Sequence, residues 1–224
     1  MGVDHSPDLK TAFSSERLIF RALEDNDGDK KFVFDMNNDA LVQTMSNLTV
    51  LKPKSAAGFQ KFMDFAQGCP IMAIACLPPF VRDDDGADTE TRMSPPDVVS
   101  QEDKARATPI GFVSIMAARG NTETTGHHRC GQLGISILRP FTGKGYGGEM
   151  INWVLDWSFR RANLHRVELG TWSVNHNAIK LYRSLGFVEE GRDREALMLD
   201  RKWVDLVRFS MLEHEWEKLR RISS

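Results

Sequence analysis

A glycine-rich segment, residues 143–148, has the composition of a loop that binds an anion. An apolar run at 133–138 precedes it, and apolar residues at three- and four-residue steps follow it as far as Phe159. The first pattern predicts a buried strand and the second predicts an amphipathic helix. Glycines let backbone N–H groups approach an anion, and a helix N-terminus adds unpaired donors and a partial positive charge. We therefore expect residues 143–148 to bind the phosphate of a cofactor.

The glycine spacing alone fits several interpretations. Gly143, Gly145 and Gly148 match the dinucleotide pattern G-x-G-x-x-G, and Glu168 follows at roughly the distance expected of a ribose-binding acid. However, residues 139–142 separate the predicted strand from the glycines, whereas the dinucleotide turn follows its strand directly. A triphosphate loop needs Ser or Thr after its Gly-Lys pair, and Gly145 takes that place here. A tight glycine turn without any ligand also fits the loop on its own.

A second segment, residues 175–187, decides among these interpretations. It follows the pattern N-x-x-A-x-x-L-Y-x-x-x-G-F at Asn175, Ala178, Leu181, Tyr182, Gly186 and Phe187. This pattern resembles the second signature of the GNAT superfamily of acyl-CoA-dependent N-acetyltransferases. One predicted helix and one predicted strand separate the two segments, as they do in that family. The resemblance is strongest over 129–212, extends by element order from residue 16, and does not cover 78–108.

The glycine loop departs from the family at one position. The first GNAT motif has the pattern [Q/R]-x-x-G-x-[G/A], and Thr142 stands where Gln or Arg is usual, with Gly145 and Gly147 in place. Residues 139–146 otherwise resemble the branch that includes ribosomal-protein N-terminal acetyltransferases and many small-molecule acetyltransferases. Because backbone amides supply most of the pyrophosphate contact in the family, we expect cofactor binding to be retained, with a lower affinity.

The resemblance implies that acetyl-CoA is the acyl donor. In the family, the strand before the loop splays from the strand that follows the next helix, and the pantetheine arm binds main-chain groups in the gap. The implied cofactor-binding residues are Ile135, Ile137, Leu138, Thr142, Gly143, Lys144, Gly145, Tyr146, Gly147, Gly148 and Asn175. For Lys144, a side chain that is solvated and does not contact phosphate is an equally favoured interpretation. Helix N-capping is an alternative for Asn175 that does not exclude the cofactor contact.

The resemblance also implies that Tyr182 is the general acid that protonates the leaving thiolate. Ala178, Leu181, Tyr182 and Leu185 recur at helical spacing, so we expect the phenol to point toward the core. The alternative is a packed tyrosine whose hydroxyl is hydrogen-bonded by the backbone.

No general base is evident in the sequence. Gln132 and Gly170 occupy the two positions where the family often has a carboxylate. Glu168 lies two residues from Gly170 and could act as the general base in its place. The favoured interpretation is that Glu168 is a surface residue of the strand. A water chain, or an acceptor amine with a low pKa, could also serve. Neither the three cysteines nor His127-His128 have the spacing of metal ligands, so we expect no metal.

These candidate residues require a sheet and several helices to position them. The resemblance implies an α/β (α+β) fold of the GNAT type, with a mixed, mostly antiparallel central sheet that is flanked by helices and has splayed strands around the cofactor. Hydrophobic patterns predict strands at 17–23, 71–77, 109–118, 129–138, 165–174, 187–199 and 203–212, and helices near 32–36, 53–68, 150–159, 175–185 and 213–220.

The whole chain, 1–224, is interpreted as a single domain with a core at about 16–213. Residues 78–108 contain paired prolines, an acidic run and few large apolar side chains, so we expect an exposed insertion. A lid over the active site is a more specific interpretation of these residues, but a surface loop without such a role is favoured.

Composition bounds the class of protein. The 224 residues are 41% hydrophobic and 27% charged, with a net charge of −2, an ordinary globular balance that offers no strong field toward nucleic acid or a membrane surface. No secretory signal or membrane-length apolar run is present, and an odd number of cysteines favours free thiols. We therefore expect a cytoplasmic protein, with a homodimer compatible with the sequence.

The sequence thus predicts acetyl transfer from acetyl-CoA to a primary amine, by direct attack of the amine on the thioester. The expected acceptor is a small amine or an amino acid, and a protein or peptide N-terminus is the alternative. A non-catalytic acyl-CoA-binding module is the rival from another class, because the usual base positions lack carboxylates. A dinucleotide-dependent oxidoreductase ranks third.

Overall fold

A seven-stranded mixed sheet, in the order β1-β2-β5-β6-β7-β9-β8, forms the centre of the computed structural model. The structure describes residues 11–46, 50–82, 90–95, 100–118 and 125–222. All neighbouring strands are antiparallel except the parallel pair β6–β7, which confirms the predicted fold class. The strands are β1 Ile19–Arg21, β2 Ile71–Leu77, β5 Thr108–Ala117, β6 Cys130–Ile137, β7 Arg166–Trp172, β8 Val188–Leu199 and β9 Lys202–Leu212.

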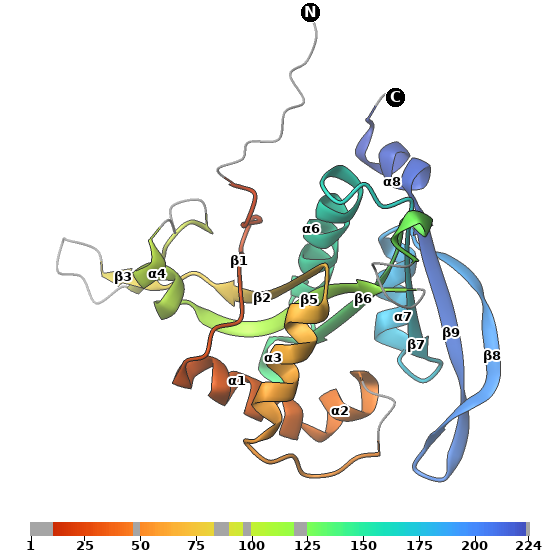
Figure 1. The fold of residues 1–224 in the computed structure, drawn as a ribbon, viewed down its shortest axis with the longest axis horizontal. Coiled ribbons are helices and arrows are strands. Elements are labelled where there is room, and N and C mark those ends of the chain that lie inside the picture. Colours follow the sequence, from red (N-terminus) through yellow and green to blue (C-terminus); the bar gives the residue numbers. More distant parts are fainter. Residues whose placement is uncertain (1–10, 47–49, 83–89, 96–99, 119–124, 223–224) are drawn as a thin grey trace, which may run out of the picture.

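Helices cover both faces of the sheet. In Figure 1, α6 and α8 lie above the central strands, and α1 and α2 lie below them. One face carries α6 Tyr146–Arg160, α7 His176–Ser184 and α8 Glu213–Arg220; the other carries α1 Asp27–Asn38, α2 Ala40–Ser46 and α3 Gly58–Gly68. No helix among the described residues is both long and apolar enough to span a membrane.

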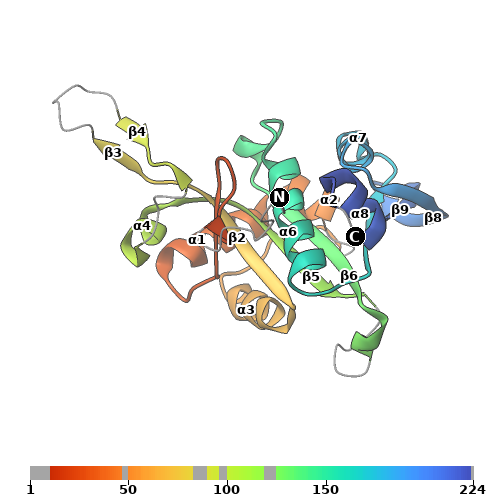
Figure 2. The ribbon, with the colours of Figure 1, turned by 90° about the horizontal axis from the view of Figure 1, so that it is seen from above.

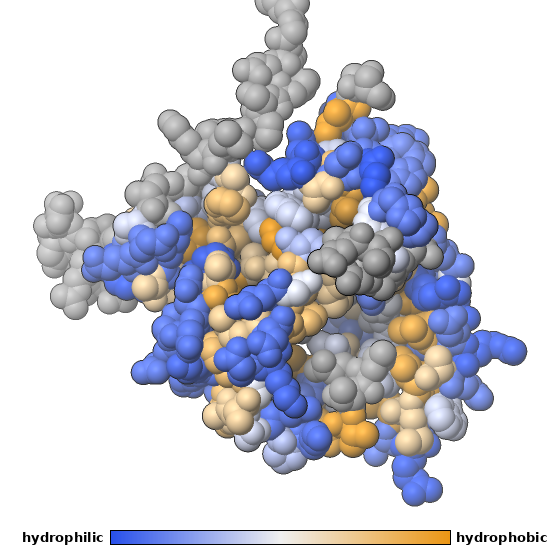
Figure 3. Space-filling model, in the orientation of Figure 1, coloured by the Kyte–Doolittle hydropathy of each residue, from blue (hydrophilic) through white to orange (hydrophobic). Residues whose placement is uncertain are grey.

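The two faces bury separate apolar clusters. On β9, Val207, Phe209 and Met211 are fully buried against the α6 face, at the two-residue period that a strand requires. The opposite cluster gathers Phe32 and Val33 of α1, whereas α3 contributes only partly buried phenylalanines. Apolar side chains of α3 therefore remain visible in the middle of the surface drawn in Figure 3. Each fully buried large side chain contributes about 1.5–3 kcal/mol, so the sheet is stabilised from both sides.

The parallel pair β6–β7 stays together over only three residue pairs. Pairing runs from Cys130↔Arg166 to Gln132↔Glu168 and then stops. Beyond this point β6 follows β5 as far as Ile137, while β7 follows β9 as far as Trp172. The two strands therefore diverge toward their C-terminal ends, as the sequence analysis predicted.

Two parts of the fold were not expected. The sequence analysis missed α2, although Asp39 precedes it and its Oδ1 accepts from the Leu41 and Val42 N–H groups as an N-cap. Within the predicted insertion, β3 Phe80–Arg82 pairs with β4 Glu90–Arg92 in a two-stranded ribbon that projects from the body (Figure 2), and α4 Gln101–Arg106 follows. Strands of three residues are too short to show a period, which is why composition alone indicated a loop. Residues 83–89 and 96–99, also in this insertion, lie outside the described residues.

We expect Trp153→Ala to lower the free energy of unfolding by about 3–5 kcal/mol, because it removes a buried ring and leaves a cavity. The Trp153 ring stacks on Phe20 with a centroid distance of 3.9 Å, and its Nε1 donates to the Ala12 carbonyl at 3.0 Å. Denaturant titration would measure the loss. Trp203, which is 60% exposed, supplies the matched control, and Trp203→Ala should change stability by less than about 0.5 kcal/mol. Equal losses in the two variants would contradict this account of the core.

Candidate active site

The glycine loop lies at the N-terminus of α6, with two residues in the left-handed region. Gly143 has φ 74° and Gly145 has φ 84°, conformations that favour glycine. The first helical backbone bond runs from the Glu149 N–H to the Gly145 carbonyl at 3.3 Å, and Gly145 supplies no side-chain cap. The N–H groups of the preceding three helical residues therefore have no partner within the helix. This is the geometry that an anion requires.

Two further glycines let α6 approach α7. A Cβ on Gly147 would lie 3.3 Å from Leu181 Cδ2 and 3.4 Å from Ile137 Cδ1, and one on Gly148 would lie 3.5 Å from Leu181 Cδ1. The loop motif and the second motif therefore meet directly through Leu181. The helix that carries Tyr182 is consequently packed against the first turn of α6.

Thr142 and Lys144 have different surroundings within the loop. The Thr142 N–H and Oγ1 both donate to the Arg139 carbonyl, at 3.2 and 2.9 Å, which closes a 3₁₀ turn at Arg139–Phe141. The Thr142 hydroxyl therefore fixes the loop. Lys144 is exposed, and its Nζ lies 5.6 Å from the centroid of the Phe141 ring.

The three cofactor-binding candidates on β6 and directly after it are not equivalent. The Leu138 N–H donates to the Ile110 carbonyl at 2.8 Å, and the Leu138 carbonyl accepts from the Phe141 N–H at 2.9 Å. Both main-chain groups of Leu138 are occupied, so the expectation that it offers free groups to a cofactor is wrong. Hydrogen-bonded pairs alternate along an antiparallel ladder, so Ile135 and Ile137 turn their main-chain groups away from β5 and into the gap beside β7.

Tyr182 lies on the buried face of α7, as its spacing predicted. It is 7% exposed and packs against Phe187 and Phe209, with ring centroids 6.0 and 5.7 Å apart. Burial raises the pKa of Tyr182 to about 12, so the phenol stays protonated at neutral pH. No described residue is hydrogen-bonded to its hydroxyl, which argues against a hydroxyl satisfied by the backbone.

Asn175 caps α7, which was the alternative role considered for it. Its Oδ1 accepts from the Ala178 N–H at 3.2 Å. This bond uses the acceptor atom of the side chain, so the amide nitrogen is the group left for a ligand. Its position, between the end of β7 and α7, is beside the widening gap.

The three candidate base positions do not supply a free carboxylate. Glu168 Oε2 accepts from Arg166 Nε at 2.9 Å, and Arg166 also pairs with Glu190, whose pKa it lowers to about 2. Gln132 lies opposite Glu168 in the parallel pair, and Gly170 has the side chain of Leu206 beside it. Glu168 is therefore held in an ion pair with Arg166, which disfavours it as a base. Among the described residues, no group of three or more His, Cys, Asp or Glu side chains could hold a metal ion.

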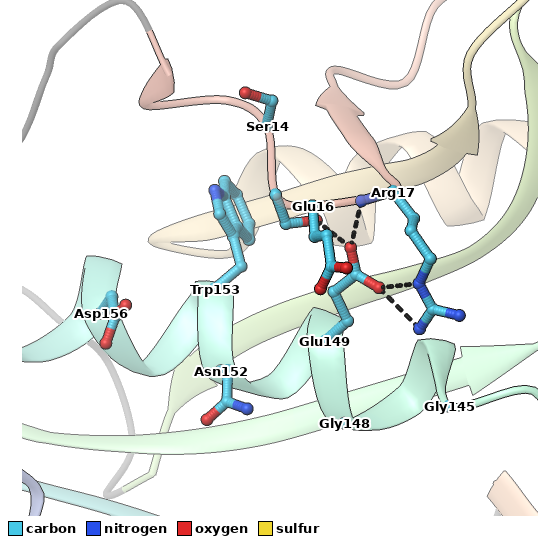
Figure 4. Close-up of a pocket in the computed structure, with 10 residues that line it drawn as sticks. Ser14, Glu16, Arg17, Gly145, Gly148, Glu149, Asn152, Trp153 and Asp156 are labelled. Atoms are coloured by element: carbon cyan, nitrogen blue, oxygen red, sulfur yellow. Dashed lines mark hydrogen bonds and ion pairs between the residues drawn. The ribbon is translucent and has the colours of Figure 1, made fainter. Parts of the chain in front are cut away.

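Sequence reasoning missed an ion pair beside the glycine loop. Arg17 and Glu149 join the N-terminal segment to α6 beside the glycine loop, and a shallow pocket lies between these two segments (Figure 4). An Arg before the first strand and a Glu in a helical first turn are each common, so only their contact in space distinguishes them.

Another feature of the site is an apolar wall on the α2 side of the sheet. Trp172 is 8% exposed but belongs to neither core cluster, and it pairs in register with Leu206 of β9. Because Val167 and Leu169 face the α6 cluster, strand alternation turns Trp172 to the opposite face. On that face α2 lies against both β6 and β7.

Comparison with known families agrees with this geometry. A family model described as an acetyltransferase (GNAT) domain matches residues 17–188. The chain therefore belongs to the GNAT acetyltransferases, a family that uses acetyl-CoA as the acyl donor.

Particular relatives are named as N-acetyltransferases. The chain is 35% identical to a spermidine N(1)-acetyltransferase of Vibrio cholerae over 89 residues, which cover 40% of this chain and 51% of that protein. It is 30% identical over 90 residues to a provisionally assigned ribosomal N-acetyltransferase of Bacillus subtilis, which cover 40% and 49% of the two chains. The chain thus spans about half the length of these curated relatives.

Solved structures share the fold over most of their length. A spermidine N-acetyltransferase from Vibrio cholerae in complex with CoA and spermine has a TM-score of 0.66 at 23% identity, covering 89% of this chain and 98% of that one. A GNAT-family acetyltransferase from Bacillus anthracis has a TM-score of 0.64 at 17% identity, covering 90% and 98%.

Tyr182 should titrate later than a solvent-exposed tyrosine. Since its pKa is about 12 in the native state and about 10 in an unfolded chain, the native state holds the proton more tightly. Its contribution to stability is complete below about pH 10 and is lost as the pH rises toward 12. The sequence has two tyrosines, so tyrosinate absorbance of the wild type minus that of Tyr182→Phe isolates this group. A difference band that develops fully by pH 10 would contradict the buried phenol.

Proposed function

We propose that the chain transfers the acetyl group of acetyl-CoA to a primary amine by direct attack of the amine on the thioester. The observation that carries this proposal is the gap between β6 and β7, which opens beside the glycine loop. The main-chain groups of Ile135 and Ile137 border it, and the phenol of Tyr182 is free of any described hydrogen-bond partner. A ligand with an anionic end and an arm that carries amides fits these groups.

Each part of the site has a distinct role toward that ligand. When bound, acetyl-CoA supplies the thioester whose acetyl group is transferred. The N–H groups of Tyr146, Gly147 and Gly148 bind its phosphates, since they are the unpaired donors of the α6 N-terminus. The main chain at Ile135 and Ile137 binds the amides of the pantetheine arm and so orients the thioester. The loop residues Gly143, Gly145 and Lys144, with the Asn175 amide nitrogen, complete the proposed cofactor contacts.

The chemistry requires a neutral amine, a donor to the carbonyl oxygen, and a proton for the leaving sulfur. An N–H of β6 that faces the gap stabilises the negative charge that develops on the oxygen. The Tyr182 phenol donates its proton to the sulfur as the carbon–sulfur bond breaks. An alkyl ammonium has a pKa near 10.4 and must first lose a proton. Water takes this proton, because Glu168 is held in an ion pair with Arg166 and the other candidate positions are Gln132 and Gly170.

We propose a small amine or an amino acid as the acceptor. Trp172 and Leu206 offer an apolar wall on the α2 side of the gap, and α2 carries no charged residue. On the same face Arg166 pairs with both Glu168 and Glu190, so these carboxylates already share a cation and are less available to a polycation. An acceptor with an apolar group next to its amine fits better than spermidine, the acceptor named for several relatives.

Two alternatives remain distinct from this proposal. A protein or peptide N-terminus is the second acceptor class, supported by the relative named as ribosomal. A non-catalytic acyl-CoA-binding module is supported by the occupied or missing base positions. Self-association, expected here as a homodimer, is also a proposal; a structural neighbour from Vibrio cholerae is described as dodecameric.

Thermal denaturation with ligands, followed by thiol release over an amine panel, tests the function. Acetyl-CoA and CoA should stabilise the protein by about 2.7 kcal/mol at 100 times their Kd, whereas NAD should have no effect. Thiol release should then occur with a small apolar amine or an amino acid, and more slowly with spermidine or a short peptide.

The outcomes separate the alternatives. Stabilisation by NAD alone would falsify the acetyltransferase proposal. Turnover with the peptide alone would show that the acceptor is a protein or peptide N-terminus rather than a small amine. Binding of acetyl-CoA without turnover of any amine would favour the binding module.

Tyr182→Phe should lower kcat by about 10²- to 10⁴-fold, because it removes the proton donor while keeping the buried ring. The Kd for CoA, measured by calorimetry, should stay within about twofold of the wild type, since the phenol is not proposed to bind the phosphates. An unchanged kcat in a variant that melts like the wild type would exclude Tyr182 as the acid.

A further inference from the structure

Glu149 fastens the segment before β1 to the first turn of α6. Its Oε1 accepts from Ser15 Oγ and from the Arg17 N–H, both at 2.7 Å. Its Oε2 accepts from Arg17 Nε at 2.9 Å and lies 2.8 Å from Arg17 Nη2 (Figure 4). Four donors therefore converge on one carboxylate, two of them from the Arg17 guanidinium to the single oxygen Oε2, and such charge-assisted bonds are stronger than neutral ones.

The same arginine also holds the glycine loop. Arg17 Nη1 donates to the Lys144 carbonyl at 3.0 Å, and the guanidinium carbon lies 4.7 Å from the centroid of the Tyr146 ring. Between these two contacts lies Gly145, where a Cβ would come within 3.2 Å of Arg17 Nη2. One side chain thus fixes the residues on both sides of the left-handed glycine from which α6 starts.

The charge of Glu149 makes this contact relevant to a phosphate ligand. Its carboxylate belongs to the helical turn whose free N–H groups face the proposed phosphates. A free carboxylate there favours the helix but opposes a second anion at the same terminus. Arg17 neutralises it and turns the Lys144 carbonyl toward the guanidinium.

We propose that Arg17 is a positioning residue for the phosphate end of the acyl donor. It acts through Glu149 and the Lys144 carbonyl, which it holds so that the α6 N-terminus presents donors to the anion. This inference rests on the proposed function. If Arg17 only stabilised the fold, its substitution would lower stability without changing the affinity for an anionic ligand.

The experiment measures the Kd for CoA by calorimetry and the acetyl-CoA dependence of turnover. Arg17→Gln should raise both Kd and the KM for acetyl-CoA about 10- to 100-fold, the range expected for lost charge-assisted hydrogen bonds, with kcat at saturation within about twofold. Arg17→Lys retains the charge without the fork and should give an intermediate Kd. Adding Glu149→Gln to Arg17→Gln should recover part of the affinity, because the uncompensated carboxylate is removed.

A matched control exists on the same helix. Arg220 Nε pairs with Asp156 at 2.9 Å near the other end of α6, so Arg220→Gln breaks a comparable ion pair away from the loop and should leave Kd unchanged. Unchanged Kd in Arg17→Gln would overturn the inference, and so would a double variant that binds no better than Arg17→Gln. In both cases the proposed function stands if the wild type binds CoA. A wild type that binds no CoA would overturn the proposed function, and this inference with it.

Discussion

The divergence of β6 from β7 is the constraint on which the rest of the site depends. Each strand is held along its other edge, β6 by β5 and β7 by β9, and the two share only three residue pairs. A sheet interrupted in this way leaves main-chain donors and acceptors without ladder partners, which would cost free energy if they were buried and unpaired. A ligand that carries amides can satisfy them, and this is why we propose that the pantetheine arm binds at the break in the sheet.

The two ends of this gap differ in their electrostatics. At one end, the start of α6 concentrates N–H donors and needs a neutralised Glu149 if an anion is to approach. Near α7, burial keeps the Tyr182 phenol protonated, so it can donate a proton. The arginine pairs differ accordingly. Arg17 pairs with Glu149 beside the proposed phosphate site, whereas Arg166 pairs with Glu168 and Glu190 on the proposed acceptor face.

Much of the fold follows from local sequence, whereas parts of the site do not. The strand Ile71–Leu77 was predicted to the residue, because a continuous apolar run flanked by proline has few other readings. Tyr182 was placed on the buried face of α7 from helical spacing alone. The loss of Leu138 from the cofactor set depends on a hydrogen bond to Ile110, and the Arg17–Glu149 pair joins residues 132 positions apart. Neither contact leaves a periodic signal in the sequence, since both arise only when distant segments meet.

The close packing of Gly147 and Gly148 against Leu181 has a mechanical consequence. The first turn of α6 packs its glycines directly against the Leu181 side chain of the helix that carries Tyr182, so a shift of one helix would displace the other. A displacement of the α6 N-terminus, where we propose that the phosphates bind, would therefore also displace α7 and the phenol of Tyr182. The two signature motifs of this chain are therefore joined through Leu181.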